Sequence, residues 1–560
     1  MLSYILDVLV NSWRFVRNVL AGLRRPPEYI AMEVGGSLPE FEQPVSFLRR
    51  RFFPVPTPIS IERLRGRLDT ISEDGRTTGI LLRVRNLDAS WAALEEARSE
   101  LARFRERGGR VVVYLTDPDT RAYYLACAAD EIYATPISTV NIVGLRTRVN
   151  FLRDALKQVG VEAEVVAVSP YKSAGDTFVR NDFSRESREQ TERLLDRRFA
   201  ELVSAVAGGR KMTPDEARER IDSAPHTAPE AVSQKLLDAA CYEDELYDRL
   251  GAGDERANIE EWGAARKVLR VPYRERARKV VGLVRLSGAI VRGRSRRLPV
   301  PVPFLGGEQA GDESVVAALR AAEKSRRVAA IIFHVDSRGG DALASDLIWR
   351  EIERIRAKKP VVVLMGEAAA SGGYYVSAAA SHIVARSNTI TGSIGVIIIR
   401  PTTADLYGKL GVNPVAVERG EHAGFLDPSY RPTPEEISSL TGQLRFIYGE
   451  FKDRVGKGRE MSVEDVEDIA GGRVWTGGEA LERGLVDEIG GYRSALRRAR
   501  ELAEIGDDVP ESVVRISPPR NVRPAPGEPA PAAIEALKQT FDLTRTTRIW
   551  AISPYETNGD

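Results

Sequence analysis

Ser371 is the residue best suited to act as a nucleophile. It lies in Glu367-Ala-Ala-Ala-Ser371-Gly-Gly-Tyr-Tyr375, where an apolar strand-like run meets a predicted helix that Gly372 and Gly373 open. A serine in such a tight turn presents its hydroxyl group, and the free amides at a helix start favour negative charge. Acyl transfer needs this combination of a nucleophile and an oxyanion donor. The alternative is a serine that only caps the helix.

A second pair of glycines, Gly339 and Gly340, also stands between a β-rich run and a helical pattern, in Val335-Asp-Ser-Arg-Gly-Gly340. Amides at such a turn are free to bind an anion. If the two runs are neighbouring parallel strands, amides from both turns can surround one oxygen atom. The alternative is that these are ordinary loop glycines.

A serine nucleophile needs a base, and none of the four histidines stands with an evident carboxylate partner in a triad-like arrangement. Lys172, in Ser169-Pro-Tyr-Lys-Ser-Ala-Gly175, is the candidate. Burial can lower a lysine pKa from about 10.4 to near 7, at a cost of about 4 to 5 kcal/mol. The alternative is a solvated surface lysine, which is what most lysines are.

The nucleophile and the base lie in different halves of a duplicated sequence. A constant offset of 251 positions relates Ser371 to Thr120. After a two-residue gap, Glu421 stands where the first half has Lys172. One copy therefore lacks the serine and the other lacks the lysine. The repeat predicts one composite site per pair of halves.

The elements that must position these residues follow the same order in both halves. A strand pattern, a helix pattern and a second strand pattern occur at 79–85, 92–107 and 110–115, and again at 329–335, 342–357 and 360–365. Strands separated by helices predict an α/β fold with parallel sheets and helical crossovers.

The length of 560 residues and a repeat of roughly 250 predict duplication of a whole domain. We divide the chain into five segments. They are an amphipathic helix (1–27), a first half with the lysine (28–265), a connector (266–278), a second half with the serine (279–500), and a proline-rich linker and tail (501–560). Within the tail, 533–541 is predicted as a short helix and 549–552 as an apolar contact.

The composition excludes several classes of function. A net charge of +1 provides no field for nucleic acid. The only two cysteines, Cys127 and Cys241, exclude a disulfide framework and a cysteine-based zinc site, and we predict that both are buried. No metal or cofactor is expected.

The first residues carry an apolar stripe at helical spacing. Its members are Leu2, Leu6, Leu9, Trp13, Val16, Leu20 and Leu23. Polar and charged residues on the opposite face make a membrane span or a cleaved signal peptide a poor explanation. An amphipathic helix lying in a membrane interface fits the pattern. The alternative is a stripe that packs on the protein or on a sister subunit.

The ordered motifs resemble those of the signal peptide peptidase A (protease IV) family of membrane-associated Ser/Lys peptidases, in its long, internally duplicated form. The similar segments are Tyr171-Lys-Ser-Ala174, Ser337-Arg-Gly-Gly340, Ala369-Ala-Ser-Gly-Gly-Tyr-Tyr375 and Thr391-Gly-Ser-Ile-Gly395. The resemblance covers about residues 28 to 500.

The resemblance implies tandem domains of the crotonase and Clp protease type and a site split between the halves. It implies Ser371 as the nucleophile, Lys172 as the general base and Ser393 as the hydroxyl that supports the lysine. The implied oxyanion amides are those of Gly372 and of either Gly339 or Gly340. It further implies cleaved signal peptides and other short or unfolded apolar peptides as substrates, a homotetramer, and association with the cell membrane.

Two departures from the family keep alternatives open. Arg338 stands where the family usually has proline, which motivates a catalytically impaired membrane scaffold of the same fold. The family's long form carries an N-terminal membrane span, whereas this chain offers an amphipathic helix. A crotonase-like acyl-CoA enzyme is the other alternative. Lys172 can come from the same chain as Ser371 or from an adjacent subunit.

Overall fold

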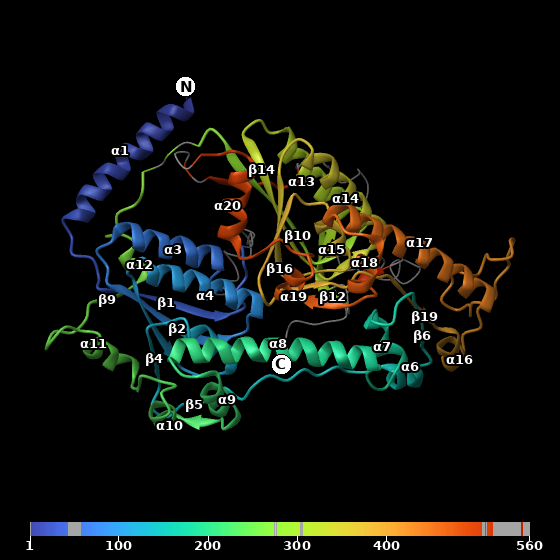
Figure 1. Cartoon of the computed structure of the whole chain (residues 1–560), viewed down its shortest axis with the longest axis horizontal. Helices are drawn as coiled ribbons and strands as arrows, with labels where there is room; N and C mark the ends of the chain where they lie inside the picture. The colour runs from blue at the N-terminus through green and yellow to red at the C-terminus, as the bar shows by residue number, and fades with distance from the viewer. Residues whose placement is uncertain are drawn as a thin grey trace. The chain divides into compact units, whose positions relative to one another are not determined.

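The chain forms two compact units, the first made of Met1–Arg146 and Leu195–Arg276 and the second of Thr147–Leu194 and Ala277–Asp560. The structure is a computed structural model, and it describes residues 2–42, 58–273, 275, 277–302, 306–506, 510, 512–518 and 550–552 (Figure 1). The predicted helix at 533–541 and most of the predicted linker lie outside these residues. The segment Thr147–Leu194, which the sequence places in the first half, belongs to the second unit.

The first unit is built on a six-stranded sheet with the order β8-β4-β3-β2-β1-β9. All neighbouring strands in it are parallel. In chain order the strands are β1 (Tyr29–Gly36), β2 (Gly79–Leu87), β3 (Arg110–Leu115), β4 (Glu131–Ala134), β8 (Ala239–Ala240) and β9 (Ile259–Glu261). Helices α3 (Ile61–Asp74), α4 (Trp91–Glu106) and α5 (Thr120–Ala126) lie between the first four strands in the sequence.

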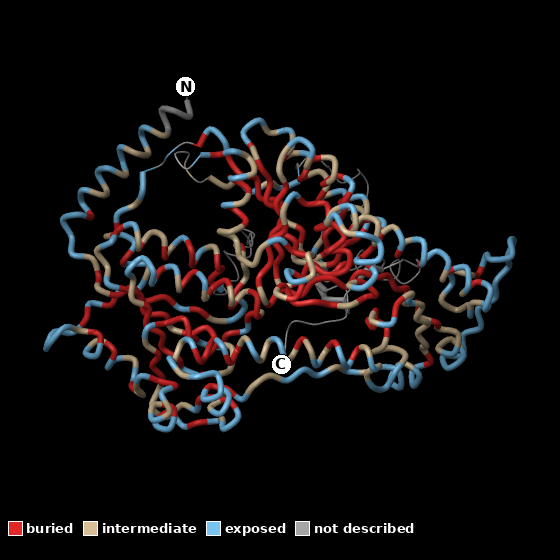
Figure 2. Tube along the Cα trace, in the orientation of Figure 1, coloured by how far each residue is buried: buried red, intermediate tan, exposed pale blue. Residues whose placement is uncertain are grey.

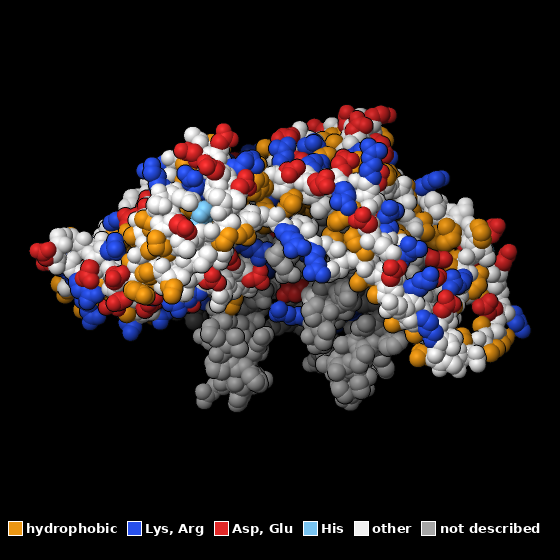
Figure 3. Space-filling view, turned by 90° about the horizontal axis from the view of Figure 1, so that it is seen from below, with side chains coloured by type: hydrophobic (Ala, Val, Ile, Leu, Met, Phe, Trp, Pro, Cys, Tyr) orange, Lys and Arg blue, Asp and Glu red, His pale blue; other side chains and the backbone are white. Residues whose placement is uncertain are grey.

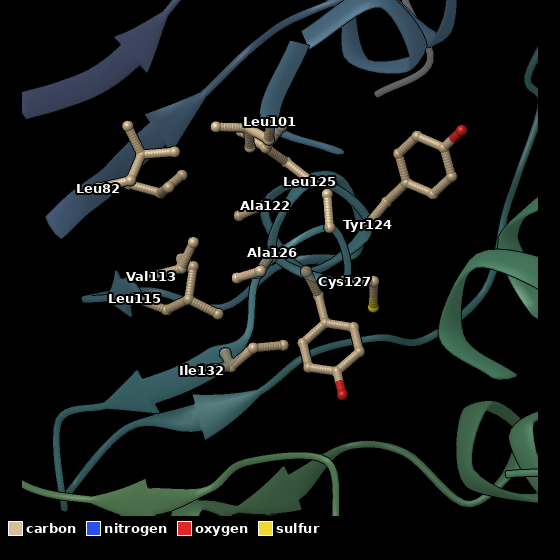
Figure 4. Packing of buried hydrophobic residues seen from close by; sticks show 14 of the residues in the cluster. Leu82, Leu101, Val113, Leu115, Ala122, Tyr124, Leu125, Ala126, Cys127 and Ile132 are labelled. Carbon is tan, nitrogen blue, oxygen red and sulfur yellow. The ribbon is translucent and has the colours of Figure 1, made fainter. Parts of the chain in front are cut away.

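The core of this unit lies between the sheet and its helices. Figure 4 shows Leu82, Val113 and Leu115 from the strands directed towards the helix that carries Leu125. Cys127 lies in the same core, and burial raises the pKa of its thiol to about 11. Both cysteines are free and buried, as predicted.

The second unit repeats this plan with a larger sheet, in which β16, β14 and β10 are adjacent and parallel. The strands on its main path are β10 (Val280–Ser287), β14 (Val328–Ser337), β16 (Val361–Ala370), β18 (Ile390–Gly392), β20 (Val474–Thr476) and β22 (Val513–Arg515). The helices that cover it include α13 (Asp312–Lys324), α14 (Ala342–Arg356), α15 (Gly372–Ser377), α17 (Pro434–Arg459) and α20 (Tyr492–Leu502). Figure 2 shows this sheet as the most continuous buried part of the unit. The predicted duplicated α/β fold with parallel sheets is confirmed.

A second sheet in this unit brings distant segments together, in the order β12-β13-β11-β15-β23-β19-β6. Its members are β6 (Glu162–Ala167), β11 (Ala289–Val291), β12 (Arg296–Val302), β13 (Gly306–Gly311), β15 (Gly339–Asp341), β19 (Ile397–Thr402) and β23 (Trp550–Ile552). Strand β6 pairs antiparallel with β19, from Ala167 opposite Ile397 to Glu162 opposite Thr402. This pairing fixes the segment that leads into Lys172.

Helix α1 (Leu2–Gly22) belongs to the first unit and contacts the rest of that unit through polar side chains. Its polar side chains bind the body: Arg14 and Asn18 donate to the carbonyls of Pro272 and Val271, at 2.7 and 2.8 Å. The apolar stripe of the described side chains, which includes Trp13 and Leu20, is exposed. No helix among the described residues is long and apolar enough to cross a membrane.

Basic and acidic side chains are interspersed on the face drawn in Figure 3. The sequence has 81 Lys and Arg residues and 80 Asp and Glu residues, so a mixed surface is expected.

Candidate active site

Ser371 stands at the turn between β16 and α15. Its backbone has φ 56° and ψ −115°, a region that residues other than glycine rarely occupy. The Ser371 amide donates to the carbonyl of Gly392 at 2.8 Å, which holds the turn against β18. A strained residue of this kind persists only where its surroundings over-determine it, and such residues cluster at functional sites. The predicted strand-to-helix turn is therefore present, in a conformation that suits a nucleophile.

Lys172 reaches this serine within the same chain. Its Nζ atom lies 2.6 Å from Ser371 Oγ, at hydrogen-bond distance. Two further atoms complete its surroundings, because Nζ lies 2.9 Å from the carbonyl oxygen of Ser393 and 3.0 Å from Ser393 Oγ. Three residues that the sequence predicts for the site thus meet at one nitrogen atom.

The three residues are buried, with exposed fractions of 2% for Lys172 and 0% for Ser371 and Ser393. Burial disfavours the charged form of an amine. It lowers the pKa of the Lys172 ammonium group well below its ordinary value. The prediction of a buried lysine with a depressed pKa agrees with this environment.

A glycine pair that the sequence reasoning missed holds the backbone of Lys172 in place. A Cβ atom on Gly472 would lie 2.5 Å from the Lys172 amide nitrogen, and Gly472 has φ +84°. The Tyr171 amide donates to the carbonyl of Gly471 at 3.2 Å. The sequence signal for this role was the Gly471-Gly472 pair, which Arg473 separates from the start of β20.

Gln190 is a second residue that the sequence reasoning missed. Its side chain, 1% exposed, donates to the carbonyl of Tyr171 at 3.1 Å and accepts from the amide of Val474 at 2.7 Å. It therefore ties the loop of Lys172 to strand β20. A glutamine inside the long polar helix α8 (Arg185–Arg210) carries no sequence signal for this contact.

Ser393 follows the end of β18 and also has a left-handed backbone, with φ 51°. Its amide donates to the carbonyl of Arg473 at 2.6 Å. This conformation brings both the carbonyl and the hydroxyl of Ser393 to Lys172 Nζ.

The two glycine turns are in direct contact. A Cβ atom on Gly372 would lie 3.1 Å from the Gly340 nitrogen and 3.2 Å from the Gly339 Cα. As the first residue of α15, Gly372 has an amide without a partner inside its helix. The Gly339 amide instead donates to Ser337 Oγ at 3.1 Å. Gly372 and Gly340 are consequently the better pair of candidates for holding an oxyanion.

The turn forms although Arg338 replaces the proline expected from the family. Gly339 and Gly340 have φ +109° and +159°, and the Ser337 hydroxyl binds the backbone across the turn. The side chain of Arg338 is half-buried. The hydrogen bond between the Ser337 side chain and the Gly339 backbone therefore restrains the turn.

The first unit has no such turn at the equivalent position. Helix α5 begins at Thr120 with an ordinary cap, in which the Asp119 carboxylate accepts from the amide of Ala122. The Thr120 hydroxyl donates to the carbonyls of Asn141 and Gly144, at 3.3 and 3.4 Å. Glu421, the counterpart of Lys172, is exposed. The asymmetry of the two halves in sequence is also an asymmetry in structure.

No group of three His, Cys, Asp or Glu side chains in the described part of the chain could hold a metal ion. A hollow of about 560 Å³ on α13, lined by residues such as Val316, Arg320 and Leu347, contains none of the predicted site residues.

A serine on a strained turn with a buried amine at hydrogen-bond distance is the arrangement of a serine hydrolase. Two stretches of this chain, 103–256 and 353–506, each match peptidase family S49. The chain belongs to peptidase family S49 and is a serine peptidase of the duplicated kind.

Two named relatives match most of the chain. The chain is 32% identical over 479 residues to "Serine protease SPPA, chloroplastic" of Arabidopsis thaliana, covering 83% of this chain and 69% of the relative. It is 30% identical over 473 residues to "Protease 4" of Haemophilus influenzae, covering 81% of this chain and 75% of the relative.

Solved structures of two kinds also match parts of the chain. A ClpP1 variant from Listeria monocytogenes is 18% identical with a TM-score of 0.23, covering 39% of this chain and 94% of the other. An enoyl-CoA hydratase/isomerase family protein from Hyphomonas neptunium is 21% identical with a TM-score of 0.21, covering 34% of this chain and 64% of the other.

Proposed function

We propose that this protein is a membrane-associated endopeptidase in which Ser371 is the nucleophile and Lys172 is the general base. The observation that carries the proposal is the 2.6 Å separation of Lys172 Nζ and Ser371 Oγ in a buried site. A buried amine with a lowered pKa can be neutral near pH 7, which is the state that a base requires.

The neighbours of the amine suit its neutral form. A neutral amine has two N–H bonds and one lone pair. The two N–H bonds can donate to the carbonyl and the hydroxyl of Ser393, at 2.9 and 3.0 Å. The lone pair then remains for the proton of Ser371. Ser393 is therefore proposed as the residue that orients the base.

Acylation follows from this arrangement. Lys172 takes the Ser371 hydroxyl proton while Oγ bonds to the peptide carbonyl carbon, and the carbonyl oxygen becomes an oxyanion. The amides of Gly372 and Gly340 are proposed to hold that oxyanion. The C–N bond then breaks, and Lys172 returns the proton to the leaving amine. In deacylation Lys172 removes a proton from water, and the water oxygen attacks the acyl carbon. The bond from that carbon to Ser371 Oγ then breaks, and Oγ takes the proton back from Lys172.

Cleaved signal peptides and other short or unfolded apolar peptides are the proposed substrates. The resemblance of the motifs supports this substrate class. Burial of the site also favours it, because an extended chain reaches a buried serine more readily than a folded surface does. Assembly as a homotetramer stays a prediction from the same resemblance.

Labelling with a serine-reactive phosphonate tests the proposal against its alternatives. We expect the label on Ser371, identified by mass mapping of peptides, together with loss of casein hydrolysis. An acyl-CoA enzyme of this fold would not need a phosphonate-reactive serine. An intact protein that neither takes the label nor hydrolyses casein would be the catalytically impaired scaffold.

Membrane attachment through α1 is the second part of the proposal. The polar face of α1 binds the carbonyls of Pro272 and Val271, so its apolar face is left exposed. Exposed apolar side chains grouped on one helix face are typical of an interaction surface. Trp13 and Phe15, with Arg24 and Arg25 following, suit the boundary between lipid headgroups and acyl chains.

Val16→Glu should weaken binding to vesicles of phosphatidylethanolamine and phosphatidylglycerol by at least about tenfold. The substitution removes one apolar side chain that membrane binding would bury, worth about 1.5 to 3 kcal/mol, and places a charge in the interface. Ile137→Glu is the matched control, because Ile137 is an exposed apolar residue away from α1 in the same unit. Cosedimentation measures both. Equal binding of the two variants would contradict a role for α1.

A further inference from the structure

The two turns that carry the candidate oxyanion amides meet beside a buried serine that the sequence analysis did not single out. Ser345 lies near the start of α14 and is fully buried. Its hydroxyl group donates to the carbonyl of Asp341 at 2.9 Å. A Cβ atom on Gly372 would lie 2.7 Å from Ser345 Oγ. The side chain of Ser345 therefore lies directly against the first residue of α15.

The space between the two turns admits only small side chains. The same Cβ position on Gly372 is 3.1 Å from the Gly340 nitrogen, so Ser345 Oγ, Gly372 and Gly340 share one small volume. Protein interiors are close-packed, and an added methyl group forces its neighbours to shift. A larger side chain at residue 345 would therefore displace Gly372 or Gly340.

A hydrogen bond next to Ser345 restrains the two helices from moving apart to accommodate a larger side chain. The Tyr375 hydroxyl of α15 donates to Asp346 Oδ1 of α14 at 2.8 Å. Tyr375 is itself buried, with its ring centroid 4.6 Å from that of Phe451 in α17. Because this bond holds α15 against α14, extra volume at residue 345 should act mainly on the turn of Gly372.

The first half of the chain provides a comparison, because α4 corresponds to α14 at the offset of 251 positions. In both helices the capping side chain accepts from the amide three residues further on. The positions of Ser345 and Gly372, however, hold Leu94 and Arg121 in the first half. The small pair thus occurs in the half that has the candidate nucleophile, and the half without it has two large side chains.

We propose that Ser345 is a positioning residue, whose small size sets the separation of the Gly372 and Gly340 amides around the oxyanion. This inference rests on the proposed peptidase function of Ser371 and Lys172. Ser345 acts through Gly372 and needs no contact with the substrate. The two amides stabilise charge that develops only in the transition state, so their separation affects kcat more than KM.

Two substitutions of different size at residue 345 test the inference. Ser345→Val adds volume and should lower kcat by about 100-fold, the effect of losing one oxyanion donor, while KM stays within about threefold. Ser345→Ala adds no volume and should keep kcat within about threefold of the native value. Hydrolysis of a fluorogenic peptide measures both constants, and the melting temperature shows whether each variant is folded.

Ser377→Val is the matched control. Ser377 is also a fully buried helix serine, and its hydroxyl donates to the carbonyl of Gly373, four residues earlier, at 2.7 Å. It lies at the end of α15, away from the turn of Gly372. This variant should lower the melting temperature as Ser345→Val does, and its kcat should stay within about threefold of the native value.

A double variant separates positioning from a general loss of stability. Gly372→Ala should lower kcat by about 100-fold, because its Cβ would lie 2.7 Å from Ser345 Oγ. The φ of Gly372 is outside the left-handed region, so alanine adds no backbone strain. Adding Ser345→Ala removes the closest contact and should restore kcat by about tenfold. Two merely destabilising substitutions would give no such recovery.

Three results would each overturn the inference while leaving the proposed function intact. They are a native kcat in folded Ser345→Val, an equal loss of kcat in Ser345→Ala and Ser345→Val, and no recovery in the double variant. If Ser345→Val does not fold, the double variant decides. A native protein that neither hydrolyses the peptide nor takes a phosphonate label on Ser371 would instead overturn the proposed function, and the inference with it.

Discussion

Ser371→Ala should lower kcat/KM for a peptide or ester substrate by at least about 10⁴-fold. The substitution removes Oγ, the proposed nucleophile, which lies 2.6 Å from Lys172 Nζ. It leaves the amides of Gly372 and Gly340 in place. Steady-state hydrolysis of a fluorogenic peptide measures the change. Circular dichroism and the melting temperature check that the variant is folded.

Thr120→Ala is the matched control for this prediction. Thr120 occupies the same position in the repeat, at the start of the corresponding helix α5. Its hydroxyl only donates to the carbonyls of Asn141 and Gly144, so its removal should leave kcat/KM unchanged. A loss of activity in Thr120→Ala equal to that in Ser371→Ala would contradict the single composite site.

Lys172→Met should abolish hydrolysis to a similar degree, because it removes the base and keeps an unbranched apolar chain of similar length. In the proposed mechanism the active form of Lys172 is the neutral amine. We expect kcat/KM to rise with pH and to level off above the depressed pKa of Lys172. A kcat/KM that falls steadily as the pH rises from 5 to 9 would contradict Lys172 as the base.

The same lysine makes the stability of the fold depend on pH. Burial lowers the pKa of Lys172 in the folded state, while the unfolded chain keeps a lysine pKa of about 10.4. Between the two values the unfolded state binds more protons, so stability rises with pH. Relative to Lys172→Met, the native unfolding free energy should rise by about 1.4 kcal/mol per pH unit in this window. Denaturant unfolding at several pH values measures the slope, and parallel curves for the two proteins would contradict a buried neutral lysine.

The candidate nucleophile and base could be predicted from the sequence because the motifs resemble a known family and because the repeat compares two copies of one domain. Ser371 differs from Thr120 in a glycine-rich turn, and Lys172 differs from Glu421 in the other copy. Apolar runs also mark the strands that carry these turns. The predicted strand at 360–365 is the first part of β16, and the predicted helix at 342–357 is α14.

Other features depend on contacts between distant segments and have no local pattern. The close approach of Lys172 to Gly472 and the bridge made by Gln190 each join segments that are far apart in the sequence. The left-handed backbone of Ser371 arises from its surroundings, because serine alone disfavours it. The pairing of β23 with β15 likewise depends on an open edge that the sequence does not mark. The membership of Thr147–Leu194 in the second unit follows from the pairing of β6 with β19.

In the proposed mechanism, the origin of Lys172 and Ser371 in separate parts of the chain also determines when during biosynthesis the enzyme can become active. The two residues are 199 positions apart. At a synthesis rate of about 5 to 20 residues per second, roughly 10 to 40 s pass between their additions to the chain. Gly472, which holds the lysine backbone, is added later still. Under this mechanism, an unfinished chain on the ribosome has no complete active site, so it should not cleave other nascent proteins nearby.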